Sequence, residues 1–169
     1  KDLQGFFPKH EINVIGNHVD LNLFESQEKS KNEKTQFLHV STLDFQTKNP
    51  EGIFEACELL KSKSDNFNLT IVCDEDVAEW KELVKTKKLE SFITFAGPLK
   101  WEELVPYYQK ADAFVLFSTY ETFSIVLVEA WLTGTPTITT SVGVAANMPL
   151  SNGLIVNQNN SEELASSML

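Results

Sequence analysis

Two glutamates bracket a run of residues that is otherwise mostly apolar. Glu121 and Glu129 are separated by the seven residues Thr-Phe-Ser-Ile-Val-Leu-Val. This run predicts a buried helix, and a glutamate is almost never fully buried without a partner, so Glu129 needs one. A ligand that reached both carboxylates would offer hydroxyl groups at each end and an anion between them. A sugar joined through a diphosphate to a ribose has this arrangement. The structural alternative is that Glu121 stabilises the helix start while Glu129 pairs with a core lysine.

The region between the two glutamates would suit a phosphate. The backbone amides near Phe123, Ser124 and Ile125 would open the predicted helix, where unpaired N–H groups form an anion site. Lys48 directly precedes a second predicted helix and could supply a positive charge to the same group. The alternative for Lys48 is a solvated surface lysine, because lysines are mostly exposed.

Short β-rich runs alternate with helical patterns along the chain, which predicts a parallel sheet with crossover helices. Asn49 and Pro50 form a cap and a first helical residue, and Pro106 should divide the segment after Trp101 into two short helices. The predicted strands cover residues 11–15, 37–41, 68–72, 92–95, 113–117, 136–140 and 153–156. The predicted helices run over residues 50–63, from 74–76 to 85–88, within 101–110, after Phe117 to Leu132, and from 160–163 onward. The fold class is therefore α/β: a doubly wound, mostly parallel, Rossmann-like sheet with helices on both faces.

Ligands bind doubly wound sheets at the carboxyl ends of the strands. Three predicted loops meet that description: Thr42 to Asn49, Ala96 to Lys100, and Ser118 to Ser124. Lys48 and Glu121 lie in two of these loops, which indicates one site at the carboxyl edge.

Composition limits the classes of partner. A chain of 169 residues with 42% hydrophobic residues and a formal net charge of −10 fits one acidic globular domain and disfavours nucleic acid as a partner. Cys57 and Cys73 both lie in apolar segments, which indicates buried thiols in a reducing, cytoplasmic setting. His10 and His18 have no metal-ligating neighbours at the usual spacings, so we expect no metal.

The segment from Phe114 to Ala130 resembles the E-x7-E signature of retaining glycosyltransferases of family 4, which have the GT-B fold. Further segments follow in the order that the family shows. They are Asn13-Val14-Ile15-Gly16-Asn17-His18-Val19-Asp20, Phe95-Ala96-Gly97-Pro98, Gly134-Thr135-Pro136 and Asn152-Gly153-Leu154-Ile155-Val156. The similarity extends over nearly the whole chain from about residue 11.

The resemblance implies a role for each matching residue. Glu121 and Lys48 would be catalytic, Glu121 contacting the donor sugar and Lys48 stabilising charge on the leaving diphosphate. Glu129 would bind the ribose hydroxyls. The remaining donor-binding positions would be Thr42, Thr122, Phe123, Ser124, Ile125, Gly97 and Pro98, with the Gly97-Pro98 loop bordering the base. The family needs no cofactor or metal beyond its nucleotide-sugar donor.

Three positions depart from the family pattern. Thr42 stands where an arginine often contacts the diphosphate, so one of two expected cations is missing. Thr122 replaces the usual glycine after the first glutamate and adds a Cβ where the backbone approaches the donor. The segment from Gly143 to Asn147 lacks the usual Gly-Gly-x-x-Glu pattern.

We therefore expect the donor-binding half of a retaining hexosyltransferase that builds a polysaccharide or glycoconjugate. Residues 1–36 would be an interdomain entry segment and polar connector, and residues 37–169 the nucleotide-sugar-binding domain. The chain begins at Lys1 and stops in a helical pattern, so we interpret it as a fragment that is inactive without its N-terminal domain. That absent domain would bind the saccharide or lipid-linked acceptor and could bring the enzyme to a membrane surface. The alternatives are a non-catalytic doubly wound interaction module and a fragment of a GT-B nucleotide-sugar epimerase.

Overall fold

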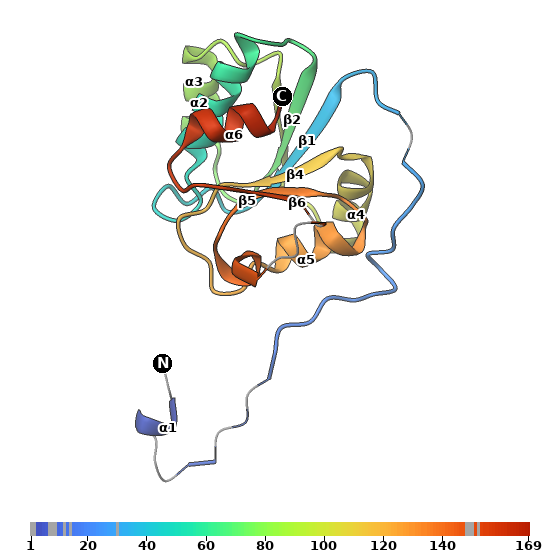
Figure 1. Cartoon of the computed structure of the whole chain (residues 1–169), viewed down its shortest axis with the longest axis vertical. Coiled ribbons are helices and arrows are strands. Elements are labelled where there is room, and N and C mark those ends of the chain that lie inside the picture. The colour runs from blue at the N-terminus through green and yellow to red at the C-terminus, as the bar shows by residue number, and fades with distance from the viewer. Residues whose placement is uncertain are drawn as a thin grey trace.

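The computed structural model describes residues 3–6, 10, 11, 13, 15–29, 31–147, 151 and 153–169. Its centre is a six-stranded parallel sheet in the order β3-β2-β1-β4-β5-β6 (Figure 1). The strands are β1 Thr35–Val40, β2 Phe67–Val72, β3 Ile93–Gly97, β4 Ala113–Leu116, β5 Thr137–Thr140 and β6 Gly153–Val156. The predicted parallel α/β sheet is confirmed.

Helices cover both faces of the sheet (Figure 1). The covering helices are α2 Pro50–Lys61, α3 Ala78–Thr86, α4 Trp101–Lys110, α5 Ile125–Leu132 and α6 Ser161–Ser167. A 3-10 helix spans Gly143–Asn147, and the short helix α1, Leu3–Phe6, lies away from the sheet (Figure 1). One hydrophobic core joins the sheet to α2, α3 and α6, and a second joins it to α4 and α5. Strand β4 carries Phe114, Val115 and Leu116, all fully buried, as its continuous apolar sequence predicts.

The prediction that Pro106 would split its helix is wrong. Helix α4 runs from Trp101 to Lys110 with Pro106 inside it. The proline removes one helical hydrogen bond, at a typical cost of about 3 kcal/mol. Leu104, Val105 and Tyr108 on the same helix are buried against the sheet, and this packing outweighs the local preference.

The amino-terminal part also differs from the predicted pattern. Glu11, Asn13 and Ile15 are in no strand, and Ile15 is 92% exposed, whereas Ile12, Val14 and the motif residue Asn152 lie outside the described residues. Part of the predicted polar connector is bonded to the domain. Lys29 donates hydrogen bonds to the Ala111 carbonyl and Thr135 Oγ1, and Asn32 donates to the Lys110 carbonyl at 3.0 Å. These bonds fasten the segment to the end of α4.

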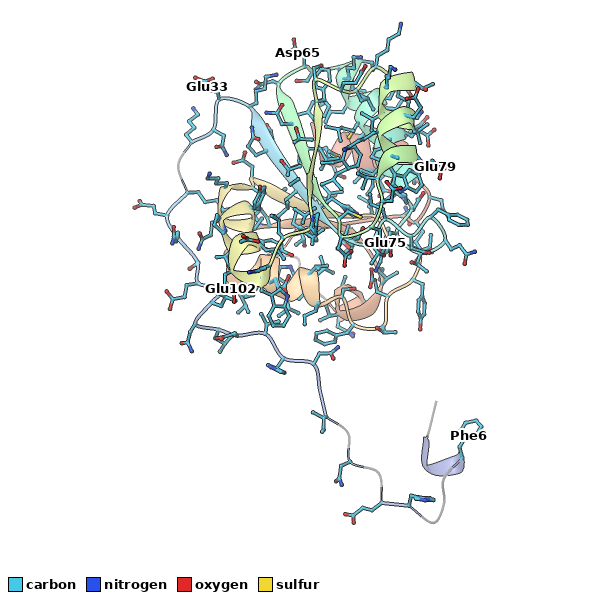
Figure 2. The ribbon with its side chains drawn as sticks, turned by 180° about the vertical axis from the view of Figure 1, so that it is seen from behind. Phe6, Glu33, Asp65, Glu75, Glu79 and Glu102 are labelled. Atoms are coloured by element: carbon cyan, nitrogen blue, oxygen red, sulfur yellow. The ribbon has the colours of Figure 1, made fainter. Side chains whose placement is uncertain are left out.

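The acidic side chains are spread over the surface of the chain. Figure 2 shows Glu33, Asp65, Glu75, Glu79 and Glu102 on different sides of the domain. Cys57 and Cys73 are buried free thiols, as predicted. None of the helices in the described part of the chain is long and apolar enough to cross a membrane.

Candidate functional site

Four loops meet at the carboxyl edge of the sheet and are held together by hydrogen bonds. The backbone N–H of Thr119, after β4, donates to the Thr47 carbonyl, after β1, at 2.8 Å. The Gln158 side chain, after β6, donates to the Thr119 carbonyl at 2.9 Å. The N–H of Val144, after β5, donates to the Phe123 carbonyl at 2.9 Å. These bonds bring together loops that are far apart in sequence.

Lys48 and Glu121 form an ion pair in the middle of these loops. Lys48 Nζ lies 2.5 Å from Glu121 Oε1, and their side chains are 20% and 9% exposed. The Ser118 hydroxyl donates to the same carboxylate oxygen at 2.8 Å. Sequence analysis selected both residues but did not pair them. The pairing means that the ammonium group is neutralised locally in an otherwise acidic chain.

Glu129 is buried, with 1% of the residue exposed. Its Oε2 accepts a hydrogen bond from the Tyr108 hydroxyl of α4 at 2.8 Å. Burial raises the pKa of Glu129, and the bond from Tyr108 offsets part of that rise. The alternative prediction that Glu129 pairs with a core lysine is wrong, because its hydrogen-bond partner is Tyr108. Tyr108 occupies only one of the two carboxylate oxygens.

The amino terminus of α5 lies next to the ion pair. Ser124 is the N-cap residue, with a left-handed backbone (φ 72°), and α5 begins at Ile125, within the stretch Phe123 to Ile125 predicted to open the helix. The Ser124 hydroxyl is buried, and among the described residues it has no hydrogen-bond partner. A buried hydroxyl without a hydrogen-bond partner is rare in native proteins.

The remaining predicted donor-binding residues lie around this centre. Thr42 is exposed on the loop after β1, and Thr122 is exposed directly after Glu121. Thr122 is not among the non-glycine residues with positive φ, so its Cβ imposes no left-handed strain there. Gly97 lies at the end of β3 and has φ 75°. In the sheet order β3 is two strands from β1, so Gly97 and Pro98 lie farther from Lys48 in the sheet order than the loop after β4 does.

Gly143 holds the loop after β5 against the start of α5. Its φ is +53°, and a Cβ at this position would lie 2.7 Å from both the Phe123 carbonyl oxygen and the Ser124 hydroxyl oxygen. An alanine would therefore push the two loops apart and add backbone strain.

Replacing Gly143 by Ala is expected to lower the free energy of unfolding by about 2 kcal/mol, from left-handed strain and the clash. Urea denaturation followed by circular dichroism measures this change. The control is Gly16→Ala, because no atom lies within 4 Å of the added Cβ at Gly16. Equal stability of the two variants would contradict the contact between Gly143 and Ser124.

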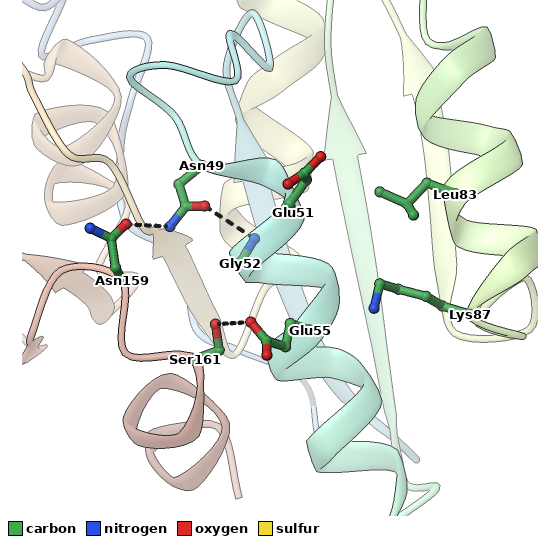
Figure 3. Close-up of a pocket in the computed structure, with 8 residues that line it drawn as sticks. All are labelled: Asn49, Glu51, Gly52, Glu55, Leu83, Lys87, Asn159 and Ser161. Carbon is green, nitrogen blue, oxygen red and sulfur yellow. Dashed lines mark hydrogen bonds between the residues drawn. The ribbon is translucent and has the colours of Figure 1, made fainter.

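A cavity of about 400 Å³ lies on the outer side of α2, between α2, α3 and the start of α6 (Figure 3). Asn49 caps α2 by accepting from the Gly52 N–H at 3.2 Å and donates to Asn159 Oδ1 at 3.2 Å. Glu55 accepts from the Ser161 hydroxyl at 2.8 Å. None of the predicted site residues lines this cavity. Its polar contacts fix the amino terminus of α2, and with it the position of the preceding Lys48.

His39 is a buried residue behind the ion pair that sequence analysis missed. Its Nδ1 lies 2.8 Å from the Val115 carbonyl oxygen, and its Nε2 lies 2.7 Å from the Ser41 hydroxyl. Burial lowers the pKa of His39 from 6.5 to about 4. The Val115 carbonyl and Glu121 oppose this shift, and Lys48 adds to it. The sequence offered one signal for this residue, a single histidine within the apolar run of a predicted strand.

The depressed pKa of His39 predicts a loss of stability in acid. The unfolded chain takes up this proton near pH 6.5 and the folded chain only near pH 4, so stability present at neutral pH is lost as the pH falls between these values. The contribution of this histidine is about 3 kcal/mol between pH 7 and pH 4. Chemical denaturation across this range measures the effect, with His39→Gln as the control that lacks the titrating group. Parallel pH profiles for both chains would refute the assignment.

Comparison with known proteins identifies the family of the chain. A profile of the family Glycosyl transferases group 1 matches residues 22–169. Mannosylfructose-phosphate synthase of Agrobacterium fabrum is 44% identical over 63 residues, which are 37% of this chain and 14% of that protein. Glycogen synthase of Mycobacterium tuberculosis is 28% identical over 135 residues, which are 79% of this chain and 32% of that protein.

A solved structure shows the same fold. The crystal structure of a TarM variant from S. aureus, in complex with UDP and saccharide ligands, has a TM-score of 0.79 at 19% identity. The match covers 99% of this chain and 34% of that one. This chain thus spans about a third or less of the length of these three proteins. Because the family profile covers most of the chain, the chain belongs to the glycosyl transferases group 1 family and has a Rossmann-like domain of the GT-B type.

Proposed function

We propose that this chain is the donor-binding half of a retaining glycosyltransferase, which transfers a sugar from a nucleotide-sugar to an acceptor. The observation that carries the proposal is the Lys48–Glu121 ion pair beside the amino terminus of α5, at the carboxyl edge of the sheet. Family membership supports the reaction class, and the UDP named in the TarM complex supports the donor class.

The diphosphate would lie between Lys48 and the start of α5. An ammonium group has three N–H donors, so Lys48 can keep its bond to Glu121 and still donate to a phosphate oxygen. The amides from Phe123 to Ile125 would face the sugar and the phosphate, and the Ser124 hydroxyl would gain the partner that it lacks. No metal is required, because Lys48 and the amides stabilise the charge that develops on the leaving group.

The two glutamates would bind opposite ends of the donor. Glu121 would contact the transferred sugar, and Glu129 would accept hydrogen bonds from the ribose hydroxyls through the oxygen that Tyr108 does not occupy. The Gly97-Pro98 loop would border the base. Thr42 stands in place of the arginine expected by resemblance, so Lys48 would be the main side-chain cation at the diphosphate.

The rest of the enzyme belongs to the same proposal. A further domain, which residues 1–36 would connect, would bind a saccharide or lipid-linked acceptor. The enzyme would act in the cytoplasm in polysaccharide or glycoconjugate synthesis, and this chain by itself would bind the donor without turnover.

Isothermal titration of the chain with UDP, GDP and their sugars tests the donor-binding role. We expect at least one nucleotide to bind with a dissociation constant below about 1 mM, the affinity of a weak but specific site. If no nucleotide or nucleotide-sugar gives a binding signal at millimolar concentration, the proposal is wrong. A non-catalytic interaction module would behave in that way, and its partner binding would survive simultaneous replacement of Glu121 and Glu129 by Gln.

A further inference from the structure

His39 links the buried sheet to the loop that carries Lys48. The residue is fully buried on β1, and its ring reaches the neighbouring strand β4 on one side and the loop after β1 on the other. The Ser41 hydroxyl also accepts a hydrogen bond from the Leu43 N–H, at 3.0 Å. One imidazole therefore connects Val115, Ser41 and Leu43.

The chemistry of the partners fixes the direction of each hydrogen bond. The Val115 carbonyl can only accept, so His39 Nδ1 must carry the proton. In the neutral ring Nε2 is then an acceptor, and the Ser41 hydroxyl must donate to it. The Ser41 oxygen is thereby left to accept from the Leu43 N–H. The ring has a single tautomer compatible with both contacts.

The chain of contacts continues from Leu43 to Lys48. Leu43 is buried and has a left-handed backbone with φ 57°, a conformation that a non-glycine residue holds only when its surroundings enforce it. The Asp44 carboxylate then accepts from the Thr47 N–H and hydroxyl, each at 2.8 Å. The Asp44 carbonyl accepts from the Lys48 N–H at 2.7 Å. Hydrogen bonds at the two ends of the loop, joined by the left-handed backbone of Leu43, thus specify the conformation between His39 and Lys48.

We propose that His39 is a positioning residue, which acts through Ser41 to hold the loop after β1 so that Lys48 faces Glu121 and the phosphates of the donor. The phosphate part rests on the proposed function, whereas the loop part rests on the contacts alone. The hydrogen bonds of His39 go to Val115 and Ser41 and not to the ion pair, so the proposed effect on Lys48 is transmitted through the loop.

Four variants of the chain separate positioning from general stability. His39→Asn keeps an amide near the position of Nδ1 but cannot reach Ser41, whereas His39→Gln places an amide near the position of Nε2 and can. Ser41→Ala removes the bridge and keeps the imidazole. The control is Phe67→Leu, a buried change at the amino end of β2, far from the carboxyl edge.

Titration with UDP and amide hydrogen exchange of Thr47 and Lys48 are the readouts. His39→Asn and Ser41→Ala should each raise the dissociation constant for UDP about tenfold, the size of one lost charge-assisted hydrogen bond. Combining them should add little, because both break the same bridge. His39→Gln should stay within about threefold of the parent chain because it restores the bridge. Both deleterious variants should speed exchange of the Lys48 N–H, which Phe67→Leu should leave unchanged.

The outcomes distinguish this inference from the proposed function. Binding of UDP by the parent chain with unchanged affinity in His39→Asn and Ser41→Ala would overturn the positioning role. Equal losses of UDP affinity in His39→Gln and His39→Asn would also overturn the positioning role. So would a nitrogen-15 spectrum that shows the ring proton of His39 on Nε2. If the parent chain binds no nucleotide, the proposed function fails, and exchange of the Lys48 amide in the variants alone decides whether His39 orders the loop.

Discussion

If the proposed function holds, replacing Glu121 by Gln in a full-length glycosyltransferase that contains this chain is expected to lower kcat by about 100- to 1000-fold, the usual effect of losing one preorganised electrostatic contact. The carboxylate lies 2.5 Å from Lys48 and accepts from Ser118, so its position is fixed before the donor binds. Glutamine keeps the shape and removes the charge that would face the donor sugar.

The same substitution should not weaken nucleotide binding. UDP has no transferred sugar, and the removal of Glu121 leaves Lys48 without a competing anion beside the phosphates. We therefore expect the affinity of the chain for UDP to stay the same or to rise by a few-fold, an electrostatic gain screened by solvent.

Steady-state kinetics and isothermal titration measure the two effects separately. The matched control is Glu79→Gln, which removes one charge from an exposed position on α3 (Figure 2). A Glu121→Gln enzyme with normal kcat, or one whose whole deficit lies in nucleotide affinity, would exclude contact between Glu121 and the reacting sugar.

Replacing Glu129 by Ala should weaken UDP binding by about 10- to 100-fold, the size of lost hydrogen bonds to a charged group. Glu129→Gln should also weaken binding, because an amide accepts less strongly than a carboxylate. Burial raises the pKa of Glu129, so the ionised form opposes folding at neutral pH. The glutamine variant should therefore unfold at the same or a higher temperature than the parent chain.

Tyr108→Phe is the control for a purely structural role of Glu129. It removes the 2.8 Å hydrogen bond to the carboxylate and leaves the carboxylate in place. We expect a loss of stability of about 1 to 2 kcal/mol with a smaller change in UDP affinity. If Glu129→Gln instead destabilised the chain as Tyr108→Phe does and left UDP affinity unchanged, the glutamate would serve the core and not a ribose.

Local patterns were sufficient where the structure follows from short-range chemistry. The continuous apolar run at residues 113–117 predicted a buried strand, observed as β4, and Asn49 followed by Pro50 predicted the start of α2. The alternation of strands and helices then required a parallel sheet whose carboxyl edge carries the loops of Lys48 and Glu121.

Local patterns failed where packing between distant elements decides the outcome. Pro106 lies inside one helix because α4 packs against the sheet, a contact that no local propensity contains. Phe24 lies in the segment read as a connector, yet it is buried against the ring of Tyr108 at 6.0 Å between centroids. The burial of one aromatic side chain is worth about 2 kcal/mol, enough to hold such a segment on the domain.

The sequence by itself determined the fold class and which side chains stand at the carboxyl edge, because these follow from periodicity and from the geometry of parallel sheets. The tertiary structure alone decided the partners: Glu121 for Lys48, Tyr108 for Glu129 and Val115 for His39. Each partner comes from another part of the chain, and the donor–acceptor distance of a hydrogen bond varies by only a few tenths of an ångström. Strand register and helix packing set those distances, and they exist only when the whole domain is assembled.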